Sequence, residues 1–276
     1  MYFDHIRFIG QSTIVLPLLG NWTPSTRFRL ESADGLGPPE VDVRIFERAG
    51  SEGSYQGRRP QAREMTFLIG LNPNDAIDET PEMLRDQIYG LFSSVNNDGI
   101  NVQFLRNETV VMRTTSWLKK CDLALFTQNP KVQLTLACAG PYFSEPTTTE
   151  LVSEIPPSNY HLVIDNKGTA PTGFRAELTF DNAIGQFVIF GNAEGTKVLM
   201  TITYPFQKDD RLIIDTNDGK RNVTRIRDGA STNLLYAMTP TSIWPQLKGG
   251  ENHFYLYPPF QFTWRSISFT AKYWGV

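Results

Sequence analysis

Apolar and polar side chains alternate along most of this chain with a period of two residues. The apolar members of four such runs are Val132, Leu134, Leu136 and Cys138; Phe174, Ala176, Leu178 and Phe180; Val198, Met200, Ile202 and Tyr204; and Phe262, Trp264, Ile267 and Phe269, the last with one slip. Alternation over four to eight residues is typical of a β-strand with one buried face. Turn-forming clusters such as Gly191–Gly195 and Thr216–Lys220 separate the runs, and Gly and Asn accept positive φ there at little cost. The pattern predicts a mainly β protein.

One segment departs from the period of two and predicts a single helix. Thr80 followed by Pro81 has the composition of a helix start, because a threonine hydroxyl caps free amides and proline has no amide to leave unpaired. The apolar residues that then recur at helical spacing are Leu84, Ile88, Leu91 and Val95. Asn96–Gly99 ends the pattern, so we expect one helix of about fifteen residues in the first half.

The segment between Gly140 and Tyr160 is the expected domain boundary. It is rich in proline and threonine, which resist a regular strand ladder. A chain of 276 residues is comfortable for two domains, since a domain typically holds about 100–200 residues. We therefore predict an N-terminal domain at residues 1–145 and a C-terminal domain at residues 146–276. The second contains about eight short strands at the spacing typical of a β-sandwich.

Composition and charge narrow the possible function classes. The net charge is −3 and no basic stretch exceeds a pair. A nucleic-acid-binding surface needs clustered basic residues to neutralise phosphates, so the sequence does not predict one. The longest early apolar run, Ile14–Leu19, is far shorter than the roughly 20 residues of a membrane span. The first residues lack the features of a signal peptide, so we expect the chain to fold where it is made. Cys121 and Cys138 are then expected to be reduced, buried thiols.

Motifs for catalysis, cofactors and metals are missing from the sequence. None of His5, His161 and His253 stands at metal-ligand spacing from another, and there is no Cys-x-x-Cys pair, Walker loop or Gly-x-Ser-x-Gly elbow. The glycine of Asp215–Gly219 comes one position too early for a calcium loop, so this segment is predicted to be a hairpin turn. Gly35–Pro39 begins like a dinucleotide loop, but its prolines prevent the helix that would have to follow. We expect no catalytic residue, no metal and no cofactor.

Two patterns leave alternatives open. Asp209 and Asp210 could in principle supply the carboxylate pair of a glycoside hydrolase. Aromatic faces stack on sugar rings, so the tryptophans keep a carbohydrate-binding module open; they are Trp22, Trp117, Trp244, Trp264 and Trp274. Trp117 and Trp264 lie in alternating strands and are expected to be core or interface residues.

Two strands near the start of the chain predict a hairpin arm. We expect Val41–Phe46 and Arg63–Gly70 to pair, with the polar, glycine-broken segment Gly50–Arg59 as the tip between them. The tip is either a plain loop or an arm that lies on a neighbouring subunit. For the arm, the candidate inter-subunit contacts by residue type are Tyr55, Gln56, Arg58 and Arg59.

This arm region resembles the N-terminal part of siphophage distal tail (Dit) proteins. The similar features are a Gly-Arg-Arg triplet after one strand, at Gly57–Arg59, and an Arg-Glu pair before the next, at Arg63–Glu64. The helix after Thr80 and the close at Ala139–Phe143 are also similar to that family. In the second half, the similar segments are Ile214–Thr224 and Trp244–Asn252. The resemblance spans nearly the whole chain.

The resemblance implies a structural protein of the phage tail or baseplate rather than an enzyme. It implies a β-rich N-terminal domain with one helix and a long hairpin arm that forms a homo-hexameric ring, followed by a galectin-like β-sandwich. In the family the ring joins the tail tube protein to the tail hub and the receptor-binding apparatus. The implied location is the tail tip of the virion, after assembly in the host cytoplasm. With no spare segment for a carbohydrate-binding insertion, the chain resembles the short form.

The galectin likeness implies a fold and not sugar binding. The sugar-binding signature of galectins has no match around His253 or Trp244, and function belongs to a site rather than to a fold. A carbohydrate-binding module acting in host-surface attachment therefore remains the alternative to the ring subunit.

Overall fold

The computed structural model describes residues 3–10, 12–18, 22–46, 54–92, 99–124, 128–151, 161–191, 197–259 and 261–276; of residues 44–46, 54–59 and 124 it describes the backbone alone. Within these residues the protein consists of antiparallel sheets and one α-helix, which confirms the mainly β class. The chain divides into two compact units. The first contains Met1–Pro146 together with Tyr273–Val276, and the second contains Thr147–Lys272.

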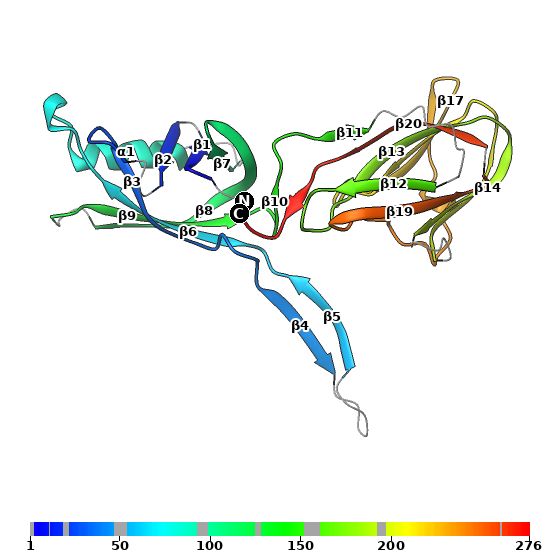
Figure 1. The fold of residues 1–276 in the computed structure, drawn as a ribbon, viewed down its shortest axis with the longest axis horizontal. Coiled ribbons are helices and arrows are strands. Elements are labelled where there is room, and N and C mark those ends of the chain that lie inside the picture. The colour runs from blue at the N-terminus through cyan, green and yellow to red at the C-terminus, as the bar shows by residue number, and fades with distance from the viewer. Residues whose placement is uncertain are drawn as a thin grey trace. The chain divides into compact units, whose positions relative to one another are not determined.

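The N-terminal unit is built on one sheet with strand order β2-β1-β7-β8-β9-β6-β3 (Figure 1). Its strands are β1 (His5–Ile9), β2 (Thr13–Pro17), β3 (Phe28–Asp34), β6 (Glu64–Leu71), β7 (Ile100–Arg106), β8 (Thr109–Ala124) and β9 (Lys131–Cys138), with the short β10 (Phe143–Ser144) and β21 (Lys272–Tyr273) beside them. Alternate residues of β9 are buried, as the period of two predicted.

The helix α1 (Pro81–Phe92) begins where the sequence predicted. The hydroxyl of Thr80 accepts a hydrogen bond from the amide of Met83 at 3.3 Å, and Pro81 is the first helical residue. Leu84, Ile88 and Leu91 are buried, because helical spacing places them on one face, and the helix contacts β2 and β6. A 3-10 turn, η1 (Asp75–Ile77), precedes the helix, and the expected continuation to Val95 lies outside the described residues.

The predicted pairing of Val41–Phe46 with Arg63–Gly70 is wrong. β4 (Val41–Phe46) pairs instead with β5 (Ser54–Pro60), and the two form a separate two-stranded sheet (Figure 1). β6 lies between β3 and β9 in the main sheet. Burial explains the difference: β6 supplies Met65, Phe67 and Ile69 to the core, whereas β4 pairs with β5, the polar strand that follows it in sequence.

The second unit is a sandwich of two antiparallel sheets with strand orders β11-β20-β13-β16-β17-β18 and β12-β19-β14-β15. The elements are β11 (Thr149–Leu151), β12 (His161–Asn166), β13 (Phe174–Phe180), β14 (Ile184–Gly191), β15 (Val198–Phe206), β16 (Arg211–Asp215), β17 (Asn222–Arg227), β18 (Ala230–Asn233), the 3-10 turn η2 (Leu235–Ala237), β19 (Gly250–Tyr257) and β20 (Phe262–Phe269). β11 and β18 have only three and four residues, too few for alternation to reveal them.

Both sheets contribute to one hydrophobic core. Leu178 and Ile267 from one sheet and Phe187 and Ile202 from the other are among its buried residues. The slip in the alternation of β20 is a β-bulge, because Ser266 pairs with Glu177 and Trp264 with Leu178. The extra residue shifts the alternation by one position, so that Ile267 and Phe269 are also buried. The unit is therefore a two-layer β-sandwich, and its likeness to galectins remains a prediction.

Candidate functional site

The β4–β5 hairpin contains every residue predicted to contact a neighbouring subunit. In the backbone register, Tyr55 pairs with Ile45, while Arg58 and Arg59 pair with Val43 and Asp42. Gln56 is the extra residue of a β-bulge between these pairs. The candidate contacts thus lie in a strand and not in a tip, which corrects the sequence-based expectation. The tip itself, residues 47–53, lies outside the described residues, as do the side chains of Tyr55, Gln56, Arg58 and Arg59.

The hairpin receives no strand pairing from the main sheet. Among the described strands, β4 and β5 pair only with each other, and they extend away from β6 (Figure 1). The Val43 side chain is 49% exposed. An isolated two-stranded hairpin is marginally stable in water, since it has no second layer to cover its side chains.

The hairpin joins the sheet at two short segments, residues 35–40 and 61–63, which we call the root. Two open hollows flank it, of about 540 Å³ and about 420 Å³. Gln61 and Ala62 line both hollows, and Arg63 lines the larger one. Among the described residues, the linings of these hollows contain no cysteine, serine or histidine.

Arg63 is the buried cation of the root. Its side chain is 3% exposed, and its guanidinium lies 4.2 Å from the centre of the Phe143 ring. Nε and Nη2 donate to the carbonyl of Pro141 at 3.1 and 3.0 Å, and Nη2 also donates to the carbonyl of Trp274 at 2.5 Å. Nη1 donates to the carbonyls of Gly35 and Gly37, each at 2.5 Å. Burial lowers the pKa of Arg63 from its usual value.

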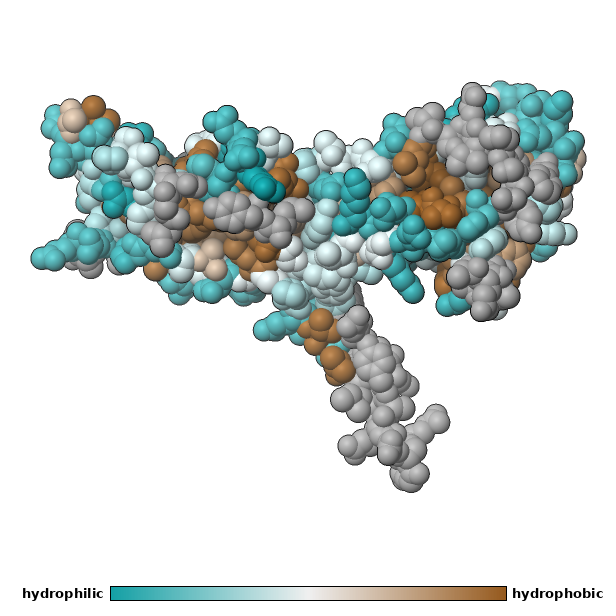
Figure 2. All heavy atoms as spheres, in the orientation of Figure 1, coloured by the Kyte–Doolittle hydropathy of each residue, from teal (hydrophilic) through white to brown (hydrophobic). Residues whose placement is uncertain are grey.

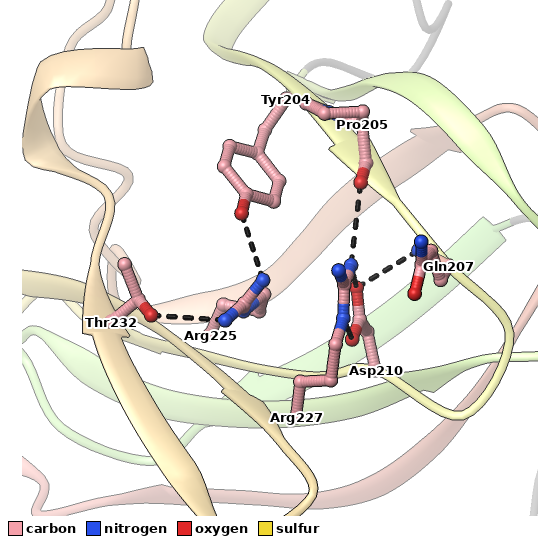
Figure 3. Close-up of polar contacts among 7 residues, drawn as sticks. All are labelled: Tyr204, Pro205, Gln207, Asp210, Arg225, Arg227 and Thr232. Atoms are coloured by element: carbon pink, nitrogen blue, oxygen red, sulfur yellow. Dashed lines mark hydrogen bonds and ion pairs between the residues drawn. The ribbon is translucent and has the colours of Figure 1, made fainter.

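Asp210, one of the two carboxylates considered for glycoside hydrolysis, is engaged in structural contacts (Figure 3). It is fully buried and accepts hydrogen bonds from Arg227 Nε at 2.6 Å, Arg227 Nη2 at 2.5 Å and the Gln207 amide at 2.8 Å. Burial by itself raises the pKa of Asp210, but these hydrogen bonds outweigh it and the pKa lies below its usual value. A general acid requires a raised pKa, so this environment does not favour that role.

Beside this ion pair, Arg225 connects the two sheets of the sandwich (Figure 3). It donates to Tyr204 Oη on β15 at 2.8 Å and to Thr232 Oγ1 on β18 at 3.0 Å. β15 belongs to one sheet, and β17 and β18 belong to the other. The polar cluster of Asp210, Arg225 and Arg227 therefore holds the sheets together at their open edge.

His161 and His253 are in contact, although their separation of 92 residues hid this in the sequence. β12 and β19 pair so that His161 lies opposite Tyr255 and Val163 opposite His253, which makes the two histidines diagonal neighbours. His161 Nε2 lies 2.9 Å from His253 Nδ1, and the His161 ring stacks on Tyr255 at 4.3 Å. Burial and the neighbouring His253 lower the pKa of His161.

This histidine pair does not extend to a larger ligand set. Glu251 lies 3.8 Å from His253 Nε2. Nowhere in the described ranges do three or more His, Cys, Asp or Glu residues meet in a way that could hold a metal ion.

None of the helices in the described part of the chain has the length and hydropathy of a membrane-spanning helix.

The remaining candidate side chains have mainly structural environments. Trp264 is a core residue, while Trp117 on β8 is 39% exposed. Cys121 and Cys138 are both free thiols. Burial raises the pKa of Cys138 to about 11 and also raises that of Cys121, so both thiols are mainly protonated at neutral pH.

The second unit matches a known protein family. Residues 167–273 match the family described as siphovirus-type tail component, C-terminal domain. No curated protein matches the sequence. The family match therefore rests on the sandwich.

Solved structures extend the likeness to the whole chain. The SPP1 Dit protein (gp 19.1) is described as a paradigm of the hub adsorption apparatus in phages that infect Gram-positive bacteria. It is 16% identical, and the match covers 97% of this chain and 98% of that one, with a TM-score of 0.59. Two chains from the phage p2 baseplate in its activated conformation also match. The one with Sr is 12% identical, with 97% of each chain covered and a TM-score of 0.41. The one with Ca is 10% identical, with 99% of each chain covered and a TM-score of 0.44. At 16% identity, the SPP1 comparison shows a shared fold.

Proposed function

We propose that this chain is a siphophage distal tail protein (Dit) that assembles into a hexameric ring as a structural subunit of the phage tail tip. The proposal is supported by the match of residues 167–273 to the siphovirus-type tail component family and by the fold that the chain shares with SPP1 Dit. In this proposal the N-terminal units form the ring. The ring joins the tail tube to the hub and the receptor-binding apparatus, and it is assembled in the host cytoplasm before it becomes part of the virion. The subunit works without catalysis, cofactor or metal.

The observation that carries the proposal is the hairpin β4–β5, whose described strands pair only with each other. Ordering a backbone costs about 1–2 kcal/mol per residue, and a neighbouring subunit that covers the hairpin would offset this cost. A contact between different surfaces of identical subunits closes into a ring when the rotation between them closes. An arm that binds the next subunit meets this requirement.

Tyr55, Arg58 and Arg59 are the proposed anchors of the arm. Tyrosine and arginine are the residue types that contribute most often to the binding energy of interfaces, because they bury a large area and also form hydrogen bonds. Gln56 marks the β-bulge in β5, and a bulge increases the local twist of a hairpin. Tyr55 lies before the bulge, and Arg58 and Arg59 lie after it. We propose that the twist directs these anchors toward the neighbouring subunit.

The size of the protein in solution tests the proposal. We expect hexamers in light scattering, either for the protein alone or with its hub protein. The double variant Tyr55→Ser, Arg58→Glu should lower the oligomer size without lowering the melting temperature. The control is Tyr89→Ser, since Tyr89 is an exposed aromatic residue on α1. A monomeric wild type under both conditions, or an unchanged ring in the double variant, would contradict the proposal.

A second candidate function, carbohydrate binding by the sandwich, is favoured by the outer face of β12 and β19. His253, Tyr255 and Tyr257 alternate along β19 and lie on that face, and Tyr257 is 52% exposed. Exposed tyrosine rings beside hydrogen-bonding histidines are the groups that stack on a sugar and bind its hydroxyls.

Binding to purified host cell-wall polysaccharide, measured by calorimetry, tests this second candidate. Tyr257→Ala should reduce binding, whereas Tyr236→Ala should not, because Tyr236 is 74% exposed but lies on η2. No binding by the wild type, or an equal loss in both variants, would exclude this face as a sugar site.

A further inference from the structure

The last four residues of the sequence, Tyr273–Val276, belong to the N-terminal unit and lie at the root of the hairpin. The carbonyl of Trp274 accepts a hydrogen bond from Arg63 at 2.5 Å, and the amide of Val276 donates to the carbonyl of Leu36 at 3.1 Å. The Tyr273 hydroxyl donates to Glu145 at 2.6 Å. A segment more than two hundred residues away in sequence is therefore hydrogen-bonded to the root.

The guanidinium of Arg63 uses all of its N–H donors on main-chain carbonyls. The five hydrogen bonds end at Gly35, Gly37, Pro141 and Trp274, which come from three separate segments. None of the ion pairs formed among the described residues involves Arg63. Arginine cannot lose its proton at physiological pH, so a buried guanidinium must be fully hydrogen-bonded to be tolerated. The carbonyl dipoles and the Phe143 ring provide that compensation.

Close backbone approach at the root leaves little space for alternative arrangements. Gly35 has a φ of +78°, and a Cβ atom there would lie 1.9 Å from the carbonyl oxygen of Glu64. A Cβ on Gly275 would lie 3.0 Å from the carbonyl oxygen of Leu36. The chain entering the hairpin is thus held against β6 on one side and against residues 274–276 on the other.

The direction of the hairpin depends on this root, because β4 and β5 pair with no other described strand. We propose that Arg63 and residues Trp274–Val276 form a clamp on the root, and that this clamp fixes the direction in which the hairpin is presented to a neighbouring subunit. Arg63 is then a positioning residue that acts through the backbone of the root. The second half of this proposal rests on the proposed function of the hairpin as an inter-subunit arm.

Distances between two spin labels measure the clamp in the full-length chain. The labels replace Val43 on the hairpin and Gln133 on β9, in a Cys121→Ser background; Cys138 can stay because it is buried. Arg63→Met removes every guanidinium donor of the clamp, and truncation after Tyr273 removes the carbonyl of Trp274 and the amide of Val276. We expect each change to broaden the distance distribution about twofold, since a released hairpin samples more orientations.

The control is Trp274→Phe, which keeps the main-chain carbonyl and should leave the distribution unchanged. Arg63→Lys retains the charge but has only three donors without the planar fork, so it should broaden the distribution less than Arg63→Met. If Arg63→Met does not fold, the truncation and Arg63→Lys decide the question. Unchanged distributions in folded variants would overturn the clamp, as would equal broadening in Trp274→Phe.

Oligomer size in the same variants separates the clamp from the proposed ring function. The spin-label distances are measured on dilute protein, so they report on the clamp even if the wild type forms no ring. Loss of rings together with broadened distances supports the proposal in full. Normal rings with broadened distances would show that the direction of the hairpin does not control assembly, and would overturn the proposed link to the neighbour.

Discussion

The β4–β5 hairpin and the C-terminal sandwich are both antiparallel β-structures, but they differ in how far they bury their apolar side chains. In the sandwich, two sheets cover each other and residues such as Phe187 and Phe262 are fully buried. The hairpin has no second sheet among the described residues, and Val43 stays half exposed. Figure 2 shows apolar side chains at the surface of the described part of the hairpin. The same secondary structure thus forms a two-layer unit with its own core in one region and, among the described residues, a single uncovered layer in the other.

The two regions also differ in the groups that compensate their buried charges. In the sandwich, Asp210 and Arg227 form an ion pair, and the neighbouring Arg225 bridges the sheets. At the root of the hairpin, Arg63 is paired with carbonyls and not with a carboxylate. The first arrangement stabilises a fold, whereas we infer that the second sets the direction of an arm.

The largest expected effect is the loss of core packing in the sandwich. Phe187→Ala should destabilise the second unit by about 3–5 kcal/mol, because it removes a large buried side chain and leaves a cavity. Chemical denaturation followed by near-UV circular dichroism measures the change. Tyr236→Ala is the matched control, and it should change stability by less than about 0.5 kcal/mol because Tyr236 is exposed. Similar losses in both variants would mean that the sandwich does not depend on its core in this way.

Breaking the buried ion pair should have the next largest effect. Asp210→Ala leaves Arg227 without its carboxylate, and we expect a loss of about 2–3 kcal/mol. In the wild type, the lowered pKa of Asp210 adds stability that is present above the unfolded-state pKa and is lost as the pH falls through the folded-state pKa. Denaturation curves between neutral and strongly acidic pH should therefore show a steeper loss for wild type than for Asp210→Ala. Parallel pH dependence in the two proteins would contradict this assignment.

Separating the two units tests whether the sandwich folds without the first half of the chain. Residues 147–272 should fold alone as a β-protein with a single cooperative transition, since its core is made within that range. Residues 1–146 should melt earlier than the same unit in the intact chain, because they lack the carbonyl of Trp274 that Arg63 binds. Calorimetry of both fragments and of the whole protein measures this. An insoluble or non-cooperative sandwich fragment would show that the domain division is wrong.

The smallest expected effect is a pH dependence at the outer face of the sandwich. The pKa of His161 is lowered in the folded state, so the folded protein binds this proton less readily than the unfolded chain. The free energy of unfolding should not depend on His161 above the unfolded-state pKa of about 6.5, and it should fall slightly as the pH drops below that value. His161→Gln should reduce this slope in melting experiments between neutral pH and pH 5. Equal slopes in the wild type and the variant would contradict the lowered pKa of His161.

The sequence alone determined the features that depend on neighbouring residues. The alternation along β9 and β13, the slip in the alternation of β20 and the cap at Thr80 all follow from local patterns, because side-chain direction in a strand and capping at a helix end act over a few residues. The resemblance to the Dit family could also be found in short motifs. None of these features requires knowledge of which strands are neighbours in space.

The tertiary structure decided which distant segments meet. The sequence could not show that β4 pairs with β5, that His161 contacts His253, or that Arg63 binds the carbonyl of Trp274. A strand with one apolar face is compatible with many partners, and the choice depends on which arrangement buries the most apolar surface across the whole unit. Carbonyl groups are present at every residue, so no pattern of residue types marks the ones that a buried arginine will bind. The hydrophobic periods therefore specify the strands, and only the closure of the whole core specifies their neighbours.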